Sequence, residues 1–479
     1  MYSRAIFPIE TDQALGVARR ILMLLLPALT LVVGVSLAVL SIGQNWPTDS
    51  NEVAALLVAA FAPLIAVLAL GAFKLGFDWI LVATAGMLTA IGTTTLFSLS
   101  LAEGANGAFY RAIVIRHGFF VGAGFLALFA GALMPRQIDR IRTFPYTLLL
   151  VALLLTLSTI VLGETVNGAR LWLKIGPIQF QPSEISRLLL AGFVAIYLYE
   201  RRYLVAAPWR AGPLNLPPAP YLLPLVGAVL AAVSVLVLQN DLGMAALVVL
   251  GAYASVASVL SSKCSLGSAG AILIVAAAAS FVVSPRVRER VVAWLEPWSD
   301  PGGRGFQFVQ AEFGLSAGGM VGQGMAASAA RVPEVHTDFI LVAVATQWGW
   351  VGAMAVLALA SIVICRCAAA ALRTADDFCS LLTLGIAALL GIQVLLICGG
   401  TLRVLPLTGL TLPLVSSGGT SMIATLFALG MVSGIGATSA RHSMDFHGVA
   451  LDLGAPQTQV RPAGLSQPLP PKPADIYTD

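Results

Sequence analysis

Long apolar segments recur along this sequence and restrict the chain to very few architectures. A helix needs about 20 largely apolar residues to cross the hydrocarbon core of a bilayer. Only helices and closed barrels satisfy their backbone hydrogen bonds there. We therefore expect an all-α polytopic membrane protein with about twelve transmembrane helices. The candidate spans are roughly 21–42, 54–73, 78–101, 115–134, 145–163, 184–199, 220–238, 242–260, 267–284, 338–365, 380–398 and 412–436.

The balance of residue types indicates the same class. Hydrophobic residues make up 58% of the 479 residues and charged residues only 10%, whereas a soluble domain carries about 25% charged residues. The net charge of +4 is spread along the chain, and no basic cluster indicates a nucleic-acid partner. The five cysteines lie in or beside apolar runs, and Cys365 and Cys367 have no histidine at ligand spacing, so no metal site is expected there.

Lysine and arginine positions predict the orientation, because short cytoplasmic loops carry an excess of both. If the N-terminus is inside, most of these residues fall on inside segments, whereas the outside loops 43–53 and 102–110 carry none. Both termini are then cytoplasmic. The expected location is the cytoplasmic (inner) membrane, with no cleaved signal peptide.

Two longer outside loops break this pattern. Loop 164–183 carries Arg170 and Lys174, and loop 285–337 carries five arginines. Longer outside loops tolerate positive charge, and this interpretation stays open for each arginine taken alone. Five together favour a site for an anionic headgroup, especially a diphosphate, which a guanidinium binds through two parallel hydrogen bonds.

Residues 332–339 (VPEVHTDF) stand where the second of these loops meets an apolar helix. An ionisable group at that depth is costly and is usually functional. Asp338 is therefore the candidate reaction centre. The alternative that Thr337 or Asp338 only caps the following helix stays open.

Further motifs stand at the same membrane boundary. Glu184 and Arg187 begin an apolar helix, where Glu184 can favour the helix dipole and Arg187 can pair with it at i,i+3. Asp241 joins two apolar runs and can simply cap the second. Residues 405–421 contain two prolines and three glycines, which predicts broken backbone at membrane depth. The four motifs are NGARLW (167–172) followed by FQPSE (180–184), LQNDLG (238–243), the tryptophan- and glycine-rich region 294–324, and LPLTGLTLPLVSSGGTS (405–421).

These motifs, taken together and in this order, closely resemble the SEDS family (shape, elongation, division and sporulation), to which RodA and FtsW belong. The resemblance covers roughly residues 80–436. It implies a peptidoglycan glycosyltransferase that polymerises lipid II at the outer face of the cytoplasmic membrane together with a class B penicillin-binding protein. The family core has ten helices, so the expected organisation is two extra helices in 1–77 and a core at 78–436. The cytoplasmic tail at 437–479 is expected to be disordered, because residues 457–471 are rich in Pro, Gln and Ser and lack apolar periodicity.

The resemblance also implies roles for single residues. Asp338 matches the essential family carboxylate and is expected to activate the incoming sugar hydroxyl. Glu184 and Arg187 match a family Glu and Lys that can hold the diphosphate and orient the site, and His336 can bond the diphosphate or simply cap the loop. The remaining expected substrate-binding residues are Arg170, Asp241 and Gln310. No ligand cluster indicates a metal, and a divalent cation that helps the diphosphate to leave stays open.

Several positions depart from the family pattern and mark a divergent member. The usual acidic pair after HTDF and an arginine before tryptophan are both missing, which changes the expected charge of the site. Two other functions therefore stay open: a flippase for lipid-linked precursors and a non-catalytic scaffold for a transpeptidase. The departures are Leu171 for Arg (with Arg170 one position earlier), Asn240 for Pro, Met244 for Thr, Ala311 for Ser, Thr346 and Gln347 for the acidic pair, Arg403 for Gly and Ser417 for Tyr.

Overall fold

The computed structural model describes most of the chain between residues 50 and 453. By its internal contacts the chain divides into residues 1–440 and 441–479. The helix bundle and the site belong to the first of these units. The described residues are 25, 29, 32, 50–72, 77–101, 105–166, 168–176, 178–206, 209–211, 214–216, 219–260, 267, 270, 285–325 and 332–453.

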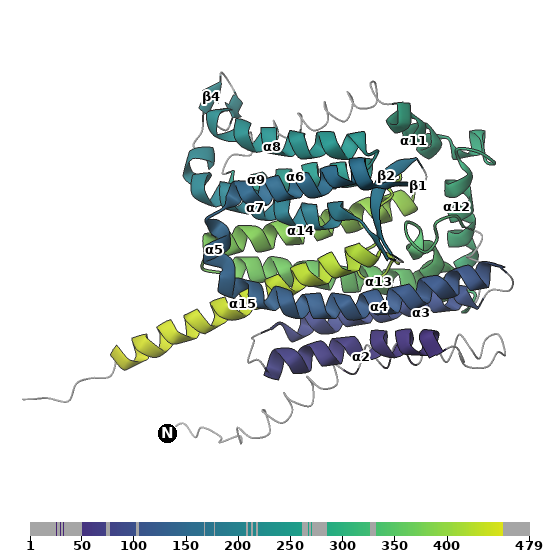
Figure 1. Cartoon of the computed structure of the whole chain (residues 1–479), viewed down its shortest axis with the longest axis horizontal. Helices are drawn as coiled ribbons and strands as arrows, with labels where there is room; N and C mark the ends of the chain where they lie inside the picture. Colours follow the sequence, from purple (N-terminus) through teal and green to yellow (C-terminus); the bar gives the residue numbers. More distant parts are fainter. Residues whose placement is uncertain are drawn as a thin grey trace, which may run out of the picture. The chain divides into compact units, whose positions relative to one another are not determined.

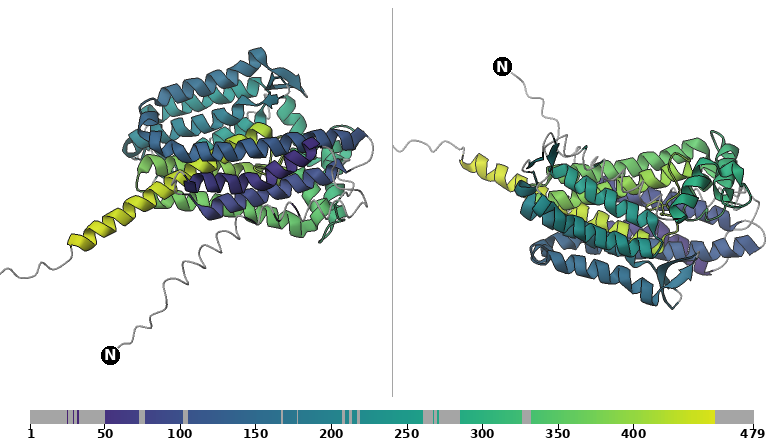
Figure 2. Two further views of the ribbon diagram at one scale, coloured as in Figure 1. Left: turned by 60° about the horizontal axis from the view of Figure 1, so that its bottom comes forward. Right: turned by 90° about the horizontal axis from the view of Figure 1, so that it is seen from above.

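Helices dominate the described residues. The long ones are α2 (Ser50–Ala72), α3 (Trp79–Ser100), α4 (Ala105–Leu133), α6 (Pro145–Leu162), α7 (Pro182–Ala206), α8 (Ala219–Leu238), α9 (Leu242–Val259), α13 (Ile340–Arg373), α14 (Asp377–Thr401) and α15 (Gly419–Leu453). Shorter helices are η1 (Met134–Gln137), α5 (Ile138–Arg142), α11 (Pro285–Leu295), η2 (Pro297–Ser299) and α12 (Phe306–Gly318). Figures 1 and 2 show the long helices of the first unit lying side by side along one direction.

Nine helices of the described part are long and apolar enough to cross a membrane. The predicted span 184–199 lies in α7, which is not among the nine and carries charged residues near both ends. Almost all of the predicted spans 21–42 and 267–284 lies outside the described residues. The architecture is that of an all-α polytopic membrane protein, as predicted.

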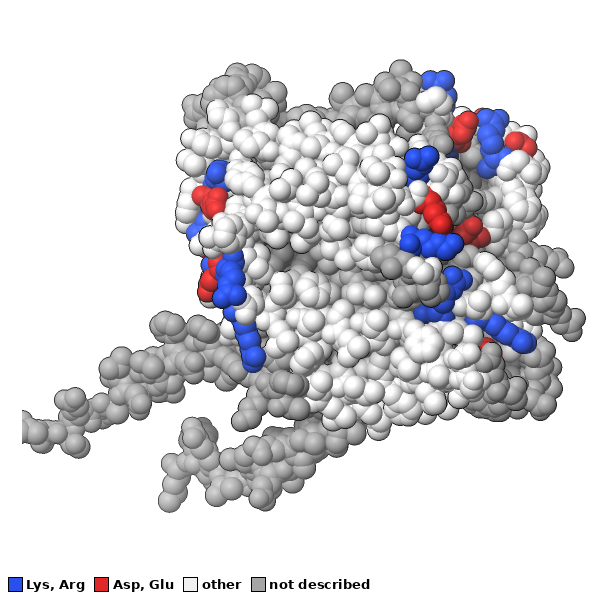
Figure 3. Space-filling model, in the orientation of Figure 1, with Lys and Arg blue, Asp and Glu red and all other residues white. Residues whose placement is uncertain are grey.

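Charged side chains gather at two opposite edges of the bundle, with an uncharged surface between them (Figure 3). At one edge, Arg366 on α13 binds Asp78 through Nε at 2.8 Å and Nη2 at 2.5 Å. At the same edge, Asp376 and Asp377 at the start of α14 pair with Arg142 and Arg202. The other edge carries the predicted outside motifs. This distribution fits a bilayer between the two edges, because charge within the hydrocarbon core is costly.

Small residues allow the central helices to approach closely. A side chain at Gly131 of α4 would collide with the backbone of Phe427 on α15, and one at Gly430 would collide with Leu128. Lipid supplies no hydrophobic force between helices, so association depends on such close packing. This contact fixes α15 against α4 and thereby positions the segment that precedes α15.

Two small antiparallel sheets interrupt the helices, and the sequence motifs did not indicate them. Strands β1 (Glu164–Val166), β2 (Ala169–Ile175) and β3 (Ile178–Phe180) pair in that order between α6 and α7. Strands β4 (Trp209–Ala211) and β5 (Leu214–Leu216) pair between α7 and α8. The first sheet is formed by the predicted outside loop 164–183, so this loop is a folded hairpin.

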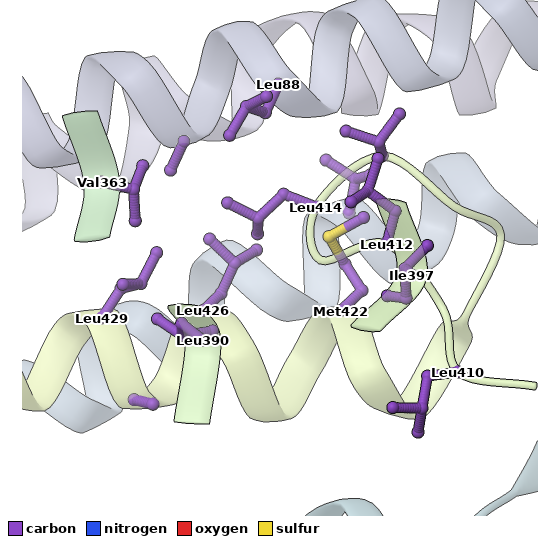
Figure 4. Close-up of a cluster of buried hydrophobic side chains, with 14 of the residues drawn as sticks. Leu88, Val363, Leu390, Ile397, Leu410, Leu412, Leu414, Met422, Leu426 and Leu429 are labelled. Atoms are coloured by element: carbon purple, nitrogen blue, oxygen red, sulfur yellow. The ribbon is translucent and has the colours of Figure 1, made fainter. Parts of the chain in front are cut away.

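The segment 402–418 between α14 and α15 is irregular, and its second half from Leu410 onward is largely buried. The expected break in the backbone at 405–421 is confirmed as far as residue 418. Helix α15 therefore begins later than the predicted span 412–436, and it also ends later. Leu410, Leu412 and Leu414 are 5%, 1% and 3% exposed. Figure 4 shows them in a cluster of buried side chains with Ile397 of α14 and Met422 of α15. The apolar side chains hold this loop inside the protein, where its backbone groups find partners away from lipid.

Candidate active site

Residues 407–409 form the meeting point of three segments that are far apart in the sequence. Arg290 of α11 donates from Nη1 to the carbonyl oxygens of Leu407 at 3.4 Å and Thr408 at 3.3 Å. A side chain at Gly243, in the first turn of α9, would collide with the same Thr408 carbonyl. A Cβ atom at Gly409 would lie 3.8 Å from Oδ2 of Asp338. The segment 407–409 thus brings Arg290, the start of α9 and Asp338 together.

Two serines of the loop 402–418 hold the backbone on which Asp338 stands. Ser417 donates to the carbonyl of His336 from both its backbone N–H and its hydroxyl, each at 2.9 Å. Ser416 donates from its hydroxyl to the carbonyl of Thr337 at 2.7 Å and accepts from the backbone N–H of Leu412 at 2.9 Å. These bonds fix the two residues that directly precede Asp338.

The turn that carries Asp338 contains a backbone conformation that side chains rarely adopt. Glu334 has φ of 53°, and its carbonyl accepts from the backbone N–H groups of Thr337 at 3.1 Å and Phe339 at 3.3 Å. A non-glycine residue in this region costs about 1–3 kcal/mol and persists where the surroundings enforce it. The turn directs residues 336–338 toward the loop 402–418 before α13 begins.

The environment of Asp338 favours its neutral form. Burial is the main cause and the negative charge of Glu334 the second, and together they raise the pKa of Asp338 to about 7, against the opposing effect of Arg290. A carboxylate with a pKa close to neutral can accept and release a proton under physiological conditions. Asp338 is therefore chemically suited to act as a general base.

Asp241 caps α9 and also faces this group. Its Oδ1 accepts from the backbone N–H of Met244 at 3.0 Å, so the capping alternative is confirmed. Its Oδ2 lies 3.4 Å from Nε2 of Gln181. Burial raises the pKa of Asp241 to about 6, with Glu184 as a further cause and Arg290 acting in the opposite direction. Asp241 therefore caps α9 and also lies close enough to Asp338 for its charge to raise the pKa of Asp338.

Glu184 and Arg187 form a buried ion pair beneath the loop 402–418. Their nitrogen and oxygen atoms are 2.8 Å apart, and the side chains are 4% and 2% exposed. Arg187 also donates from Nη1 to Oε1 of Gln393 at 2.6 Å, and Gln393 donates to the carbonyl of Thr411 at 2.8 Å. A small, mostly apolar cavity between α7, α8, α9 and α14 adjoins Arg187. The pair therefore supports the loop from below and is enclosed by protein.

His336 packs among aromatic rings at the outer end of α4. Its ring centroid lies 5.5 Å from that of Phe109 and 6.1 Å from that of Tyr110, both edge to face. Burial lowers the pKa of His336, although the nearby Glu334 opposes this. A neutral imidazole in this position can donate one hydrogen bond and accept another.

Two predicted site residues are not joined to this group by hydrogen bonds among the residues that the structure describes. Arg170 on β2 donates to Thr165 at 3.1 Å and to the carbonyl of Ile160 at 3.3 Å, so its contacts stay within its own hairpin and the end of α6. Gln310 is half-buried on α12. Among the described residues, no hydrogen bond or ion pair connects either of them with Asp338.

The glycine-rich segment that follows α12 forms hydrogen bonds with the backbone of α13 where that helix is interrupted. Gly349 has φ of 71° and ψ of −173°, so the helix is interrupted there. Backbone N–H groups of Trp350 and Val351 donate to Gly319 and Met320 at 3.0 and 3.2 Å, and those of Gln323 and Gly324 donate to Thr346 and Gln347 at 2.8 and 3.2 Å. The backbone groups that the break releases are thus satisfied by the segment 319–324.

Glu312 of α12 was not singled out by the sequence as a charged partner of Arg403. Arg403 pairs with Glu312 at 2.6 Å, Glu312 accepts from the indole N–H of Trp298 at 3.2 Å, and Trp294 donates to the carbonyl of Arg403 at 3.0 Å. The only signal in the sequence was the unusual Arg403, because its partner is remote along the chain. No group of three or more His, Cys, Asp and Glu side chains that can hold a metal occurs among the residues that the structure describes.

Comparison with known proteins identifies relatives over most of this region. The family model described as cell cycle protein, covering FtsW, RodA and SpoVE, matches residues 78–441. "Peptidoglycan glycosyltransferase RodA" of Mycobacterium tuberculosis is 36% identical over 272 residues, which cover 56% of this chain and 58% of that protein. "Probable peptidoglycan glycosyltransferase FtsW" of Aromatoleum aromaticum is 31% identical over 375 residues, which cover 74% of this chain and 87% of that protein.

A solved structure supports the fold. It is described as "Structural coordination of polymerization and crosslinking by a peptidoglycan synthase complex" and matches with a TM-score of 0.61 and 31% identity. The match covers 76% of this chain and 98% of the other. The match to the M. tuberculosis RodA spans less than two thirds of that relative's length, whereas the structural match is nearly complete for the solved chain.

Proposed function

Because the chain belongs to the FtsW/RodA/SpoVE family of cell cycle proteins, we propose that it is a peptidoglycan glycosyltransferase that polymerises lipid II. One observation carries the proposal. Asp338 stands where the turn 334–338 meets the loop 402–418, beside Gly409 and held by the bonds from Ser416 and Ser417, and burial there raises its pKa to about 7. The curated relatives named as peptidoglycan glycosyltransferases support the same activity.

In the proposed reaction, Asp338 takes the proton from the acceptor sugar hydroxyl. The hydroxyl oxygen forms a bond to the anomeric carbon of the lipid-linked chain, and the bond from that carbon to the diphosphate oxygen breaks. The electron pair leaves with the polyprenyl diphosphate, and the anomeric centre is inverted. Base catalysis of this kind contributes about 10²–10⁴-fold, and exclusion of water by the packed loop 402–418 limits competing hydrolysis.

The other predicted site residues take supporting roles in this proposal. Glu184 and Arg187 stabilise the loop 402–418, Asp241 fixes the start of α9, and His336 orients the turn beside Asp338. Arg170 and Gln310 bind the substrate in this proposal, which for these two residues rests on the family resemblance alone. The proposed setting is the inner membrane, with both termini in the cytoplasm, residues 78–436 as the core and residues 1–77 and 437–479 as additions.

We also propose that the chain works with a class B penicillin-binding protein. The solved relative described as a peptidoglycan synthase complex coordinates polymerisation with crosslinking, which supports a transpeptidase partner here. Lipid II serves as the substrate from the outer leaflet.

The decisive experiment offers lipid II to the purified chain, alone and with its transpeptidase, and separates the products by size. Glycan strands are the expected result. A flippase would instead move fluorescent lipid II across liposomes without forming glycan, and a scaffold would do neither. Either of those results from correctly folded protein contradicts the proposal.

A further inference from the structure

The connection between α4 and α6 carries two arginines that form no ion pair in the part of the chain that the structure describes. It consists of η1 and α5 (residues 134–142) and lies at the charged edge of the bundle opposite the one that carries α11 and α12 (Figures 1 and 3). Arg136 and Arg140 are exposed, and no hydrogen bond of the described residues involves either side chain. Both guanidinium groups are therefore available to a ligand.

Other arginines at this edge hold helices together instead. Arg142 binds Asp376 at the start of α14 and stands over the rings of Tyr199 and Phe378, 5.4 and 4.9 Å from their centroids. Two further pairs join separate elements, namely Arg202 with Asp377 and Arg366 with Asp78. A side chain engaged in this way cannot turn to a ligand without loosening the bundle, whereas the two exposed arginines can.

The connection keeps a surplus of positive charge after these pairs are formed. Residues 134–146 contain three arginines and one aspartate, and Arg142 is neutralised by Asp376. The remaining carboxylate, Asp139, is 96% exposed and lies 3.9 Å from Arg142. One negative charge cannot balance the guanidinium groups of Arg136 and Arg140, so the exposed surface favours an anionic ligand.

Backbone hydrogen bonds make this connection compact and join it directly to α6. The N–H of Ile138 donates to the carbonyl of Pro135, and the N–H of Phe144 donates to the carbonyl of Ile141 at 3.2 Å. Helix α6 then begins at Pro145. The two exposed arginines and the first residues of α6 therefore belong to one compact segment of the chain.

Aromatic side chains follow the arginines at the start of α6. Phe144 and Tyr146 are 58% and 56% exposed, and the ring centroid of Tyr146 lies 5.9 Å from that of the buried Phe193 on α7. Tyrosine is enriched where membrane helices meet the headgroups, because its ring is apolar and its hydroxyl is polar. Tyr146 therefore indicates the headgroup level of the bilayer, and the arginines that precede it lie within reach of lipid headgroups.

The exposed face of α6 continues this surface into the bilayer. Its apolar window is only 17% buried, the lowest share among the nine candidate spans of the described part. The exposed positions recur every three or four residues, which places them on one face of the helix. They are Tyr146, Leu150, Leu154, Leu157 and Val161. An acyl chain can lie along this face.

We propose that Arg136 and Arg140 bind the phosphate of an anionic phospholipid whose acyl chains lie along the exposed face of α6. The two guanidinium groups select an anionic headgroup over a zwitterionic one, and each can donate two parallel hydrogen bonds to the phosphate. The adjoining apolar face distinguishes a lipid from a free phosphate. This site lies at the opposite edge from Asp338, so the inference does not depend on the proposed function.

The test measures lipid binding to the purified full-length chain in a neutral detergent by native mass spectrometry. Phosphatidylglycerol is the anionic probe, phosphatidylcholine with the same acyl chains is the zwitterionic reference, and glycerol phosphate supplies the headgroup charge without chains. The variants are the double variant Arg136→Gln, Arg140→Gln, the single variant Arg140→Gln, and Asp139→Asn. Arg373→Gln is the matched control, because Arg373 is exposed in the last turn of α13 at the same edge.

Wild type should bind phosphatidylglycerol more tightly than phosphatidylcholine. Each arginine near an anionic headgroup contributes about fivefold in affinity, so the double variant should lose about tenfold to thirtyfold for phosphatidylglycerol and nothing for phosphatidylcholine. Asp139→Asn should bind phosphatidylglycerol more tightly than wild type does, because it removes the local negative charge. Arg373→Gln should bind both lipids as wild type does.

Four results overturn the inference. They are a wild type without preference for phosphatidylglycerol, an unchanged affinity in the folded double variant, an equal loss in Arg373→Gln, and binding of glycerol phosphate as tight as that of phosphatidylglycerol. The last result indicates a site for free phosphate, and an equal loss in the control indicates a general effect of charge at this edge. If the double variant does not fold, Arg140→Gln decides, with an expected loss of about fivefold.

Discussion

Asp338 gains its chemistry from its neighbours. A free aspartate is ionised far below neutral pH, whereas burial and Glu334 raise the pKa of Asp338 to about 7. The hydrogen bonds from Ser416 and Ser417 hold the residues before it. The reactivity of this side chain therefore depends on the loop that faces it as much as on its own identity.

Activity should consequently depend on pH in a defined direction. In the proposed mechanism the ionised form of Asp338 is the base, so kcat/KM should rise about tenfold per pH unit below about 7 and level off above it. The rate of lipid II polymerisation measured from pH 5 to pH 9 checks this. A flat profile across pH 7, with chemistry limiting the rate, would contradict the assignment.

Stability should show the opposite trend. The folded chain keeps the proton of Asp338 to a higher pH than the unfolded chain does, so the free energy of unfolding should fall as pH rises from about 4 to about 7. Asp338→Asn should remove part of this dependence and should be no less stable than wild type at pH 8. Thermal unfolding of both proteins at pH 5 and pH 8 provides the measurement.

The Glu184–Arg187 pair should reveal its structural role when it is broken on one side. Arg187→Met leaves a buried carboxylate without its cation, and such a loss typically costs about 3–5 kcal/mol. The double variant Glu184→Gln, Arg187→Met removes both charges and should recover much of that cost. Denaturant unfolding of the single and double variants tests this. A single variant as stable as wild type would show that the pair contributes nothing.

The break in α13 is stabilised by another element. The segment 319–324 supplies the hydrogen bonds that α13 loses at Gly349, and a side chain at Gly349 would collide with the backbone of Met320 and Gly322. The unusual φ of 71° also disfavours any residue other than glycine. Helix α13 and the segment 319–324 are therefore joined at this point. Their contact helps to orient the first part of α13, which follows Asp338.

Gly349→Ala should destabilise the fold by at least about 1–3 kcal/mol. Gly227→Ala provides the control, since Gly227 lies within helix α8 and a Cβ there meets no atom within 4 Å. Alanine at a helical position is neutral or stabilising. Melting temperatures of the two variants make the comparison, and equal values would show that α13 tolerates a regular helix at this point.

The loop 402–418 should affect catalysis through the position of Asp338. Ser416→Ala removes the hydroxyl that joins Leu412 to Thr337, and a displacement of about 1 Å at a reacting group can cost about a hundredfold in rate. We expect kcat to fall about tenfold to a hundredfold with little change in KM, and Ser416→Thr to recover part of it. Ser234→Ala on exposed α8 serves as the control. A change confined to KM would contradict a positioning role.

At the scale of the whole molecule, the long apolar helices were predictable because lipid imposes length and composition on each one separately. The position of Asp338 at the mouth of an apolar helix was predictable too, and its role as the base stays a prediction. The contacts that bring the residues around Asp338 together were not predictable from the sequence. Arg290 meets residues 407 and 408, and Ser417 meets His336, across separations that no local pattern records.

Ion pairs between positions far apart in the chain were equally impossible to predict from the sequence. Arg403 and Glu312 stand 91 residues apart and pair at 2.6 Å, so a departure that looked isolated has a partner. The hairpin of β1, β2 and β3 was also missed. Residues 169–175 do alternate apolar side chains with Arg170, Trp172 and Lys174, but β1 and β3 are only three residues long and the loop was interpreted from its charges. Local physical chemistry placed Asp338 at the start of an apolar helix, and tertiary packing determined which side chains surround it.

The most direct test of the proposed activity compares lipid II polymerisation by purified wild type and Asp338→Ala, each with its partner transpeptidase. Asp139→Asn, an exposed carboxylate at the opposite edge with a side chain 96% exposed, is the control. We predict glycan strands from wild type and Asp139→Asn and none from folded Asp338→Ala. Equal glycan from Asp338→Ala, or no glycan from folded wild type, would contradict the central claim.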